Sequence, residues 1–321
     1  MARGLAEFLR RPTVTWSLSP KKEMNLAFWK VESMGNDFPL IHLDAIDERL
    51  LPELAIILAE RHFSIGGDGL LAVGPMPGRN MRLRMFNPDG SEDFCGNGLR
   101  CAAMHGKNQS WVDQKFTIEH RGNLVPCEID AETIITEIGK ASYKAEDVPV
   151  RFRSRPDLTF QRPAIYSGTE GRLTGSALTT GSTHTVMQPL PGNRLPDDEV
   201  FRNVSSKLEN DPQFLIRTSV IWRRQVTNGV IQIRIWERGA GETIGCGTGS
   251  AAAAIEYFRE NDRGGTVEVR NPGGIVWVSV DNWESVISVR GHAAELYRGS
   301  INLEDRFNPN TLGKASNLIS V

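Results

Sequence analysis

One short pattern occurs twice in this chain and constrains its fold more than any other feature. Residues 94–103 read FCGNGLRCAA, and residues 245–254 read GCGTGSAAAA. Placing Cys95 on Cys246 matches five further pairs of small residues, namely Gly90 with Gly241, Gly96 with Gly247, Gly98 with Gly249, Ala102 with Ala253 and Ala103 with Ala254. Each copy predicts a cysteine at the start of a helix of small residues. The similarity indicates a duplicated unit, and the cleft between two copies is the natural place for a shared site.

Strand-like runs surround both copies. LRMF (83–86) precedes the first cysteine, and IRIW (233–236) precedes the second. Other β-rich or alternating runs are LAFWKV, FPLIHL, KFTIEH, NLVPCEI, TSVIWRRQV, TVEVR, IVWVSV and SVISVR. Helical windows are fewer and cover residues 50–62, 97–106, 197–209 and 248–260. This mixture favours an α+β class over a regular βαβ alternation.

A cysteine followed by glycine at a helix start has a chemical interpretation. The first turn of a helix leaves backbone N–H groups without intrahelical partners, and the helix dipole makes that end partly positive. We therefore expect the thiol pKa of Cys95 and Cys246 to be lowered there, while the glycines let a ligand carboxylate approach the same N–H groups. Two thiols facing each other across a cleft would remove a proton from one face of a carbon and deliver one to the other. Cys101 and Cys127 have no counterpart in the other copy and are predicted to be small core residues.

Composition excludes several other classes of protein. The chain has 321 residues, a net charge of -2 and only four cysteines. A net charge this small does not indicate binding to nucleic acid or to an anionic membrane. The cysteines are too few for a disulfide scaffold and lack the spacing of a zinc site. No apolar run is long enough for a membrane span, so we expect a cytoplasmic protein. Residues 1–23 are basic and predicted to be a disordered extension; a transit peptide is the weaker interpretation.

Four segments carry a resemblance to a known family. MGNDF (34–38), RHFSIGGDGLL (61–71), MFNPDGSEDFCGNGLRCAA (85–103) and RIWERGAGETIGCGTGSAAAA (234–254) are similar to diaminopimelate epimerases, in that family's order and roughly its spacing. The resemblance runs from about Met24 to Leu303. It implies two similar α+β domains, each with a mixed, largely antiparallel sheet wrapped around a central helix. It also implies an isomerase that interconverts LL- and meso-diaminopimelate without pyridoxal phosphate, any other cofactor or a metal, on the path to lysine and peptidoglycan precursors.

The resemblance implies roles for individual residues and a domain plan. Cys95 and Cys246 resemble the acid-base cysteines, with His184 and Glu237 as catalytic support. The substrate contacts that it implies are Asn36, Asn87, Gly96, Asn97, Glu237, Arg238, Gly247 and Thr248, with Arg238 at the distal carboxylate. The expected domains are 24–145 plus 292–305, carrying Cys95, and 146–291, carrying Cys246, followed by a flexible tail at 306–321. The expected partners are an amino acid substrate and a second copy of the chain in a homodimer, with no nucleic acid and no membrane.

Several departures from the family pattern leave the substrate open. Ser182 and Thr183 stand where the family typically has asparagine and proline before the histidine, and Ser219 replaces a common asparagine. The loop from Asn87 to Cys95 is one residue shorter than usual. These changes cluster on recognition of the distal end of the substrate, so a racemase for another amino acid, such as a histidine racemase, is the alternative. A thiol redox or metal-binding module is a more distant one, because the chain has no C-x-x-C pair.

Overall fold

The computed structural model describes residues 25–151, 164–168 and 171–303. One compact unit comprises Ala27–Gly299; the other comprises Met1–Leu26 and Ser300–Val321, of which only residues 25–26 and 300–303 are described. The predicted N-terminal extension (1–23) and C-terminal tail (306–321) lie outside the described residues. The site discussed below lies within Ala27–Gly299.

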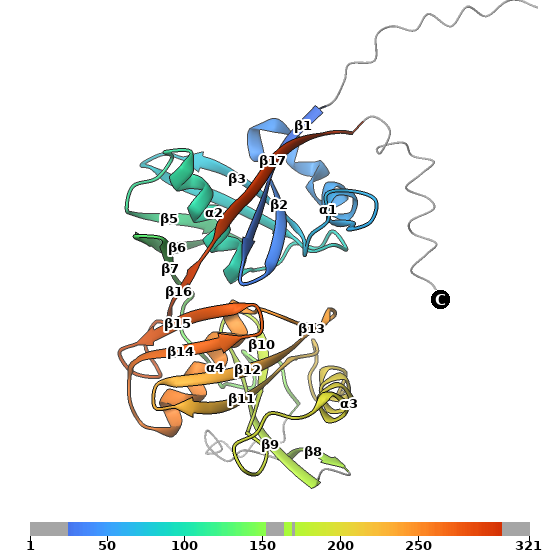
Figure 1. Cartoon of the computed structure of the whole chain (residues 1–321), viewed down its shortest axis with the longest axis vertical. Helices are drawn as coiled ribbons and strands as arrows, with labels where there is room; N and C mark the ends of the chain where they lie inside the picture. Colours follow the sequence, from blue (N-terminus) through green and yellow to red (C-terminus); the bar gives the residue numbers. More distant parts are fainter. Residues whose placement is uncertain (1–24, 152–163, 169–170, 304–321) are drawn as a thin grey trace, which may run out of the picture. The chain divides into compact units, whose positions relative to one another are not determined.

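The first half of the chain folds as a mixed sheet with a helix against it. Strands β1 to β7 pair in sequence order, and only the pairs β2–β3 and β4–β5 are parallel. Helix α1 connects β2 to β3, and helix α2 connects β4 to β5 (Figure 1). The bounds are β1 Asn25–Ser33, β2 Asn36–His42, α1 Leu51–Ala59, β3 Leu70–Met76, β4 Asn80–Phe86, α2 Gly96–Asn108, β5 Lys115–His120, β6 Asn123–Asp130 and β7 Thr133–Glu137, with short 3-10 turns at Leu43–Ala45 and Glu48–Leu50.

The second half repeats this plan. Here β10–β11 and β12–β14 are the parallel pairs, the pairs β9–β10, β11–β12, β14–β15 and β15–β16 are antiparallel, and helices α3 and α4 take the places of α1 and α2. The bounds are β8 Ala164–Gly168, β9 Gly171–Thr179, β10 Thr183–Met187, α3 Asp198–Glu209, β11 Ser219–Thr227, β12 Val230–Glu237, β13 Gly241–Thr243, α4 Gly247–Glu260, β14 Gly265–Asn271, β15 Gly274–Val280 and β16 Ser288–His292. The last strand, β17 Ala294–Asn302, returns to the first half and pairs with β1 (Figure 1). The duplication inferred from the two cysteine segments therefore extends to the strand order.

Each half has its own hydrophobic core around its central helix. The first core includes Leu99, Ala102 and Ala103 of α2, and the second includes the alanines 251–254 of α4. Strand β12 shows how alternation along a strand builds this core. Ile231, Ile233 and Ile235 are buried, and the polar residues between them are more exposed. Small helix residues allow α2 and α4 to lie deep against their sheets. The predicted α+β class with two similar sheet-and-helix halves is confirmed.

Strands β7 and β16, which hold equivalent positions in the two halves, pair with each other. They run antiparallel, with Ile135 opposite Arg290 at the centre of the ladder. One continuous network of strands thus joins the halves. Ile138, Ala141 and Tyr143 pack against the second core, while Ala293 belongs to the first. The domain boundaries at 145 and 291 stay predictions.

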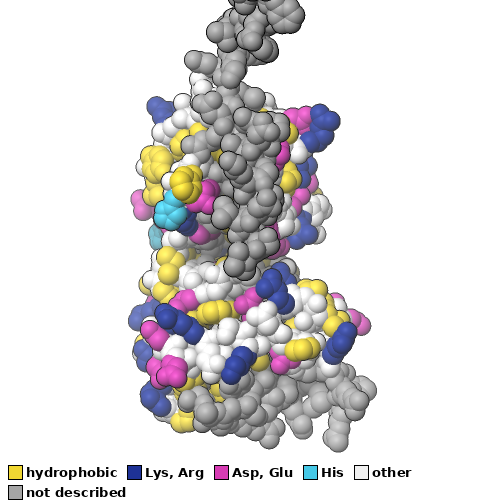
Figure 2. Space-filling model, turned by 90° about the vertical axis from the view of Figure 1, so that its right-hand side faces the viewer, with side chains coloured by type: hydrophobic (Ala, Val, Ile, Leu, Met, Phe, Trp, Pro, Cys, Tyr) yellow, Lys and Arg dark blue, Asp and Glu magenta, His cyan; other side chains and the backbone are white. Residues whose placement is uncertain are grey.

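On the face drawn in Figure 2, the described part of the chain shows basic and acidic side chains side by side. Hydrophobic side chains are scattered between them. Among the described helices, none is long and apolar enough to cross a membrane.

Candidate active site

Cys95 and Cys246 occupy matching positions at the starts of α2 and α4. Each is the N-cap residue, with φ and ψ of -138° and 110° for Cys95 and -136° and 113° for Cys246. The backbone N–H of Gly98 donates to Cys95 Sγ at 3.2 Å, and that of Gly249 donates to Cys246 Sγ at 3.4 Å. Each sulfur thus takes the place of the side-chain oxygen in an ordinary helix cap. The sequence prediction that both cysteines begin a helix of small residues is confirmed.

The two helix starts approach each other closely. A Cβ atom added to Gly96 would lie 3.8 Å from Gly247 Cα. Asn97, which is buried, extends from α2 to the other half and donates from Nδ2 to the carbonyl of Gly245 at 3.2 Å. Gly245 in turn tolerates no side chain, because a Cβ there would meet the carbonyl oxygen of Met34 at 2.4 Å. The segments before and after both cysteines therefore form one site.

Asn36 links Cys95 to a pair of charged side chains. Its Oδ1 lies 4.0 Å from Cys95 Sγ and accepts from Asn97 Nδ2 at 3.4 Å. Its Nδ2 donates to Asp68 at 2.6 Å, and Asp68 pairs with Arg61 at 2.6 Å. This orients the amide so that its oxygen faces the thiol. The side chain of Asn97 is engaged by Asn36 and Gly245, so the backbone N–H of Asn97 is the group that it offers near Cys95.

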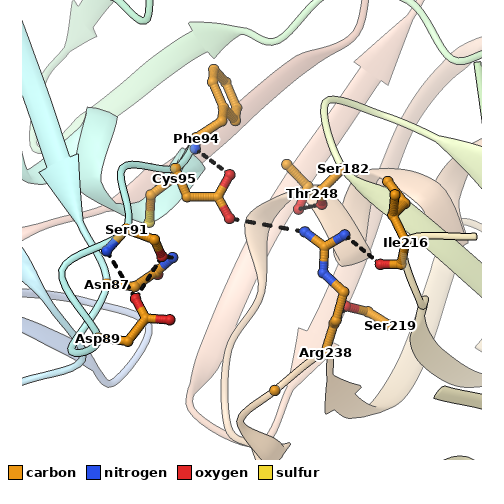
Figure 3. Close-up of polar contacts among 12 residues, drawn as sticks. Asn87, Asp89, Ser91, Phe94, Cys95, Ser182, Ile216, Ser219, Arg238 and Thr248 are labelled. Carbon is orange, nitrogen blue, oxygen red and sulfur yellow. Dashed lines mark hydrogen bonds and ion pairs between the residues drawn. The ribbon is translucent and has the colours of Figure 1, made fainter. Parts of the chain in front are cut away.

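Cys246 is connected to His184 by two hydroxyl groups. Its sulfur lies 3.5 Å from Thr248 Oγ1, which lies 3.3 Å from Ser182 Oγ, which lies 3.0 Å from His184 Nε2 (Figure 3 shows Ser182 and Thr248). Hydroxyl groups both donate and accept, so this series of hydrogen bonds can orient its protons toward a thiolate or away from a thiol. Ser182, which departs from the family pattern, forms the link between His184 and Thr248.

The chain resembles known proteins over most of its length. The sequence model described as diaminopimelate epimerase matches residues 28–144 and 179–296. The chain belongs to the diaminopimelate epimerase family. It is 35% identical over 288 residues to diaminopimelate epimerase 2 of Nostoc sp., covering 87% of this chain and 96% of that protein. It is 30% identical to the diaminopimelate epimerase of Desulforudis audaxviator, covering 85% and 98%.

Solved structures share the fold of this epimerase family member at low identity. A hydroxyproline epimerase from Agrobacterium vitis superposes with a TM-score of 0.65 at 11% identity, covering 89% of this chain and 95% of that one. A phenazine biosynthesis protein of the PhzF family from Bacillus anthracis gives a TM-score of 0.59 at 17% identity, covering 86% and 99%. These likenesses concern the fold alone.

The expected lowering of the thiol pKa in this epimerase is wrong. Burial raises the pKa of Cys95 to about 11, against the N–H groups of Gly98 and Asn97, which lower it. Burial also raises the pKa of Cys246 well above its ordinary value, and the carboxylate of Glu237 adds to the rise. Desolvation disfavours the charged thiolate more than the helix-start donors favour it. A thiolate formed here is consequently a strong base.

Glu237 ends strand β12 near the thiols, and Arg238 is the first residue after it. Thr243 Oγ1 donates to Glu237 Oε1 at 2.6 Å, and burial raises the pKa of the Glu237 carboxyl despite this bond. Arg238 is held by its backbone N–H, which donates to Ser219 Oγ at 3.1 Å, and by Nη1, which donates to the carbonyl of Ile216 at 3.0 Å (Figure 3). The Ser219 hydroxyl is thus engaged by the backbone of the same arginine that the resemblance places at the distal carboxylate.

Asn87 lies in a turn of its own loop. Its Nδ2 donates to Ser91 Oγ at 3.1 Å, and its backbone N–H donates to the carbonyl of Ser91 at 2.8 Å (Figure 3). The hydrogen bond of the Asn87 side chain therefore stabilises the turn. Its predicted substrate contact stays a prediction.

Arg100, which the sequence did not single out, is fully buried in α2 and close enough to Cys95 and Cys246 for charge interaction with both thiols. Its Nε donates to Ser33 Oγ at 3.1 Å and its Nη2 donates to Asn97 Oδ1, while Nη1 has no hydrogen-bond acceptor among the residues described. A Cβ on Gly247 would lie 3.5 Å from Nη1, so the guanidinium reaches the start of α4. Arginine stays charged even where burial lowers its pKa, so a cation lies under the site. The only signal for it was a lone charge in the otherwise small-residue stretch LRCAA.

We expect Arg100→Met to raise the pKa of the Cys95 and Cys246 thiols further, because a nearby cation favours the thiolate. The pH dependence of alkylation by iodoacetamide measures this in a background carrying Cys101→Ala and Cys127→Ala. Arg100→Lys keeps the charge and serves as the control, with circular dichroism to check the fold. An unchanged alkylation profile in Arg100→Met would contradict the electrostatic role.

His184 is expected to make the folded state of this epimerase less stable at acid pH. The side chain is fully buried, Nδ1 lacks a partner in the described part of the chain, and burial lowers the pKa of His184 to about 3. The unfolded chain therefore binds one more proton than the folded chain between pH 6.5 and 3. The contribution of neutral His184 to the free energy of unfolding is therefore complete above pH 6.5. It falls by up to about 1.4 kcal/mol for each pH unit below that.

Urea unfolding between pH 4.5 and 7 tests this. His184→Gln should make the pH dependence of the unfolding free energy shallower, while replacing the exposed His62 by glutamine should leave it unchanged. The part that remains in His184→Gln comes from His42, His105 and His120, whose pKa values burial also lowers. If the slope were the same in wild type and His184→Gln, the assignment to His184 would be wrong.

Proposed function

We propose that the protein epimerises LL-diaminopimelate to meso-diaminopimelate by two-base proton transfer between Cys95 and Cys246. The observation that carries this proposal is the matched pair of cysteine caps on α2 and α4, whose starts meet at Gly96 and Gly247. A single base would tend to return a proton to the face from which it came. Two thiols on opposite faces of one α-carbon avoid that outcome.

The proton path starts with one cysteine as thiolate and the other as thiol. The thiolate takes the α-proton, the electron pair of the C–H bond spreads onto the substrate carboxylate, and the opposite thiol gives its proton to the other face. The first sulfur is then a thiol and the second a thiolate, so the return reaction uses the same groups in reverse. The high pKa that burial gives to these thiols makes the thiolate a strong base for a weakly acidic carbon.

The helix starts would hold the carboxylate on which charge accumulates. Gly96 and Asn97 on α2, and Gly247 and Thr248 on α4, present backbone N–H groups that have no partner inside the helix. Charge that increases in the transition state interacts with these donors more strongly than the ground state does, which is the differential stabilisation that catalysis requires. Arg100 adds a buried positive charge below the same site.

The remaining predicted residues would act around this centre. We assign the reacting amino group to Glu237 and the distal carboxylate to Arg238, with Asn36 and Asn87 as further contacts. His184 acts through Ser182 and Thr248 on Cys246 rather than on the substrate. The chemistry needs no cofactor in this scheme, because the two sulfurs carry every proton. We further propose that the enzyme is cytoplasmic and works as a homodimer, as the family resemblance implies.

A second candidate is a racemase that acts on a different amino acid. Ser182 and Ser219 favour it, because they stand where the family commonly has asparagines and both hydroxyls are engaged inside the protein. Arg238 favours a substrate with a second carboxylate and hence the first candidate.

One experiment separates the candidates. The purified protein is incubated in deuterated water with LL-diaminopimelate or with a panel of L-amino acids, and NMR follows exchange of the α-proton. We expect exchange and inversion at one α-carbon of LL-diaminopimelate. Exchange confined to another amino acid would establish the second candidate, and a lack of exchange with every compound would overturn both.

A further inference from the structure

The short loop before Cys95 places a carboxylate opposite Arg238. Asp93 Oδ1 accepts from the backbone N–H of Phe94 at 2.7 Å and lies 3.3 Å from Arg121 Nη1. Its backbone N–H donates to the carbonyl of Met85 at 3.1 Å, which ties this part of the loop to strand β4. The other oxygen, Oδ2, lies 4.0 Å from Arg238 Nη2. The carboxylate is thus fixed through one oxygen, while the other faces the guanidinium.

Arg238 is fixed in a similar way from the other half of the chain. Its Nη1 is held by the carbonyl of Ile216, so that Nη2 is the end directed toward the segment with Phe94 and Cys95 (Figure 3). A separation of 4.0 Å is too long for a hydrogen bond, and both side chains remain partly exposed. Asp93 and Arg238 therefore present an acceptor and a donor to the same space, each with hydrogen-bonding capacity left.

Asp93 is close enough to Glu237 to belong to the site. Its charge contributes to raising the pKa of Glu237, together with that of Asp68. The two serines at the usual asparagine positions offer less to a distal group, since Ser219 binds the backbone of Arg238 and Ser182 binds His184 and Thr248. Apart from Asn36 and Asn87, the pair Asp93 and Arg238 is left to recognise the far end of a substrate.

We propose that Asp93 binds the distal ammonium of the substrate while Arg238 binds its distal carboxylate, so that the pair selects a substrate with a second α-amino acid end. This assignment rests on the proposed function. A carboxylate and an ammonium on one carbon lie side by side, as do their two binding groups here. A substrate that has the distal carboxylate but no distal ammonium brings its negative charge beside Asp93 without compensation. Specificity thus arises partly from repulsion of the wrong ligand.

The test compares LL-diaminopimelate with L-α-aminopimelate, which lacks the distal amine. Rates of α-proton exchange in deuterated water give kcat/KM for each compound with wild type and Asp93→Asn. We expect the wild type to prefer LL-diaminopimelate and the variant to lose roughly 10-fold to 100-fold of that preference, the usual effect of a hydrogen bond to a charged group. Asp113→Asn is the control, because Asp113 pairs with Arg79 on the exposed surface, and its ratio should equal that of wild type.

Three results would overturn the assignment of Asp93 to the distal ammonium. An unchanged ratio in Asp93→Asn would overturn the assignment while leaving the epimerase activity intact. A higher kcat/KM of Asp93→Asn for both compounds would also overturn it, because Asp93 would then only compete with substrate for Arg238. If wild type failed to exchange LL-diaminopimelate at all, the proposed function would fall and this assignment with it.

Discussion

Replacing either Cys95 or Cys246 by alanine is expected to reduce epimerisation at least about 1000-fold, because each variant lacks one of the two groups that move the proton. Both cysteines cap their helices through sulfur, so alanine also removes the acceptor for Gly98 or Gly249. Chiral chromatography of the diaminopimelate stereoisomers measures the rate of inversion directly.

Cys127→Ala is the matched control for this prediction. Cys127 is buried in the first core, and its sulfur donates to the carbonyl of Val125 outside the site. Its removal should cost some stability and leave kcat nearly unchanged. A Cys246→Ala enzyme that still inverted its substrate at close to the wild-type rate would refute the two-base mechanism.

Glu237→Gln is expected to lower kcat by about 100-fold to 1000-fold and to make the thiols easier to ionise. Glutamine keeps the size of the side chain and can still accept from Thr243, but it cannot carry the negative charge or exchange a proton. That charge is one of the causes that raise the pKa of both Cys95 and Cys246, so its removal should lower the pKa of both thiols. A purely structural defect would lower activity without this change.

Steady-state kinetics and the pH dependence of thiol alkylation together test this prediction. Glu242→Gln is the control, because Glu242 lies on the neighbouring strand β13 and pairs with Arg234 at the surface. Retention of full activity by Glu237→Gln would remove Glu237 from the mechanism.

The architecture was largely predictable because it is repeated in the sequence. The alignment of Cys95 with Cys246 indicated two equivalent helices, and LRMF and IRIW indicated the equivalent strands that precede them, which are β4 and β12. The four helical windows correspond to α1, α2, α3 and α4 with shifts of a few residues at their ends. Strong periodicity and small-residue patterns are local properties, and local properties can be read from one sequence.

The electrostatics of the site was not predictable in the same way. Arg100 and Asp93 are ordinary charged residues in the sequence, and their importance arises from contacts with residues such as Ser33, Gly247 and Arg238 that are distant along the chain. The sign of the thiol pKa shift depended on how deeply the sulfurs are buried, which the helix-start argument did not include.

The pattern of deuterium incorporation tests most directly whether two thiols act on opposite faces of one carbon. LL-diaminopimelate is incubated with wild-type enzyme in deuterated water, and mass spectrometry analyses product and remaining substrate after less than about a tenth has reacted. Delivery from the second, solvent-exchanged thiol predicts one deuterium in each product molecule and none in the remaining substrate. Equal labelling of substrate and product at that stage, or product without label, would contradict the two-thiol mechanism.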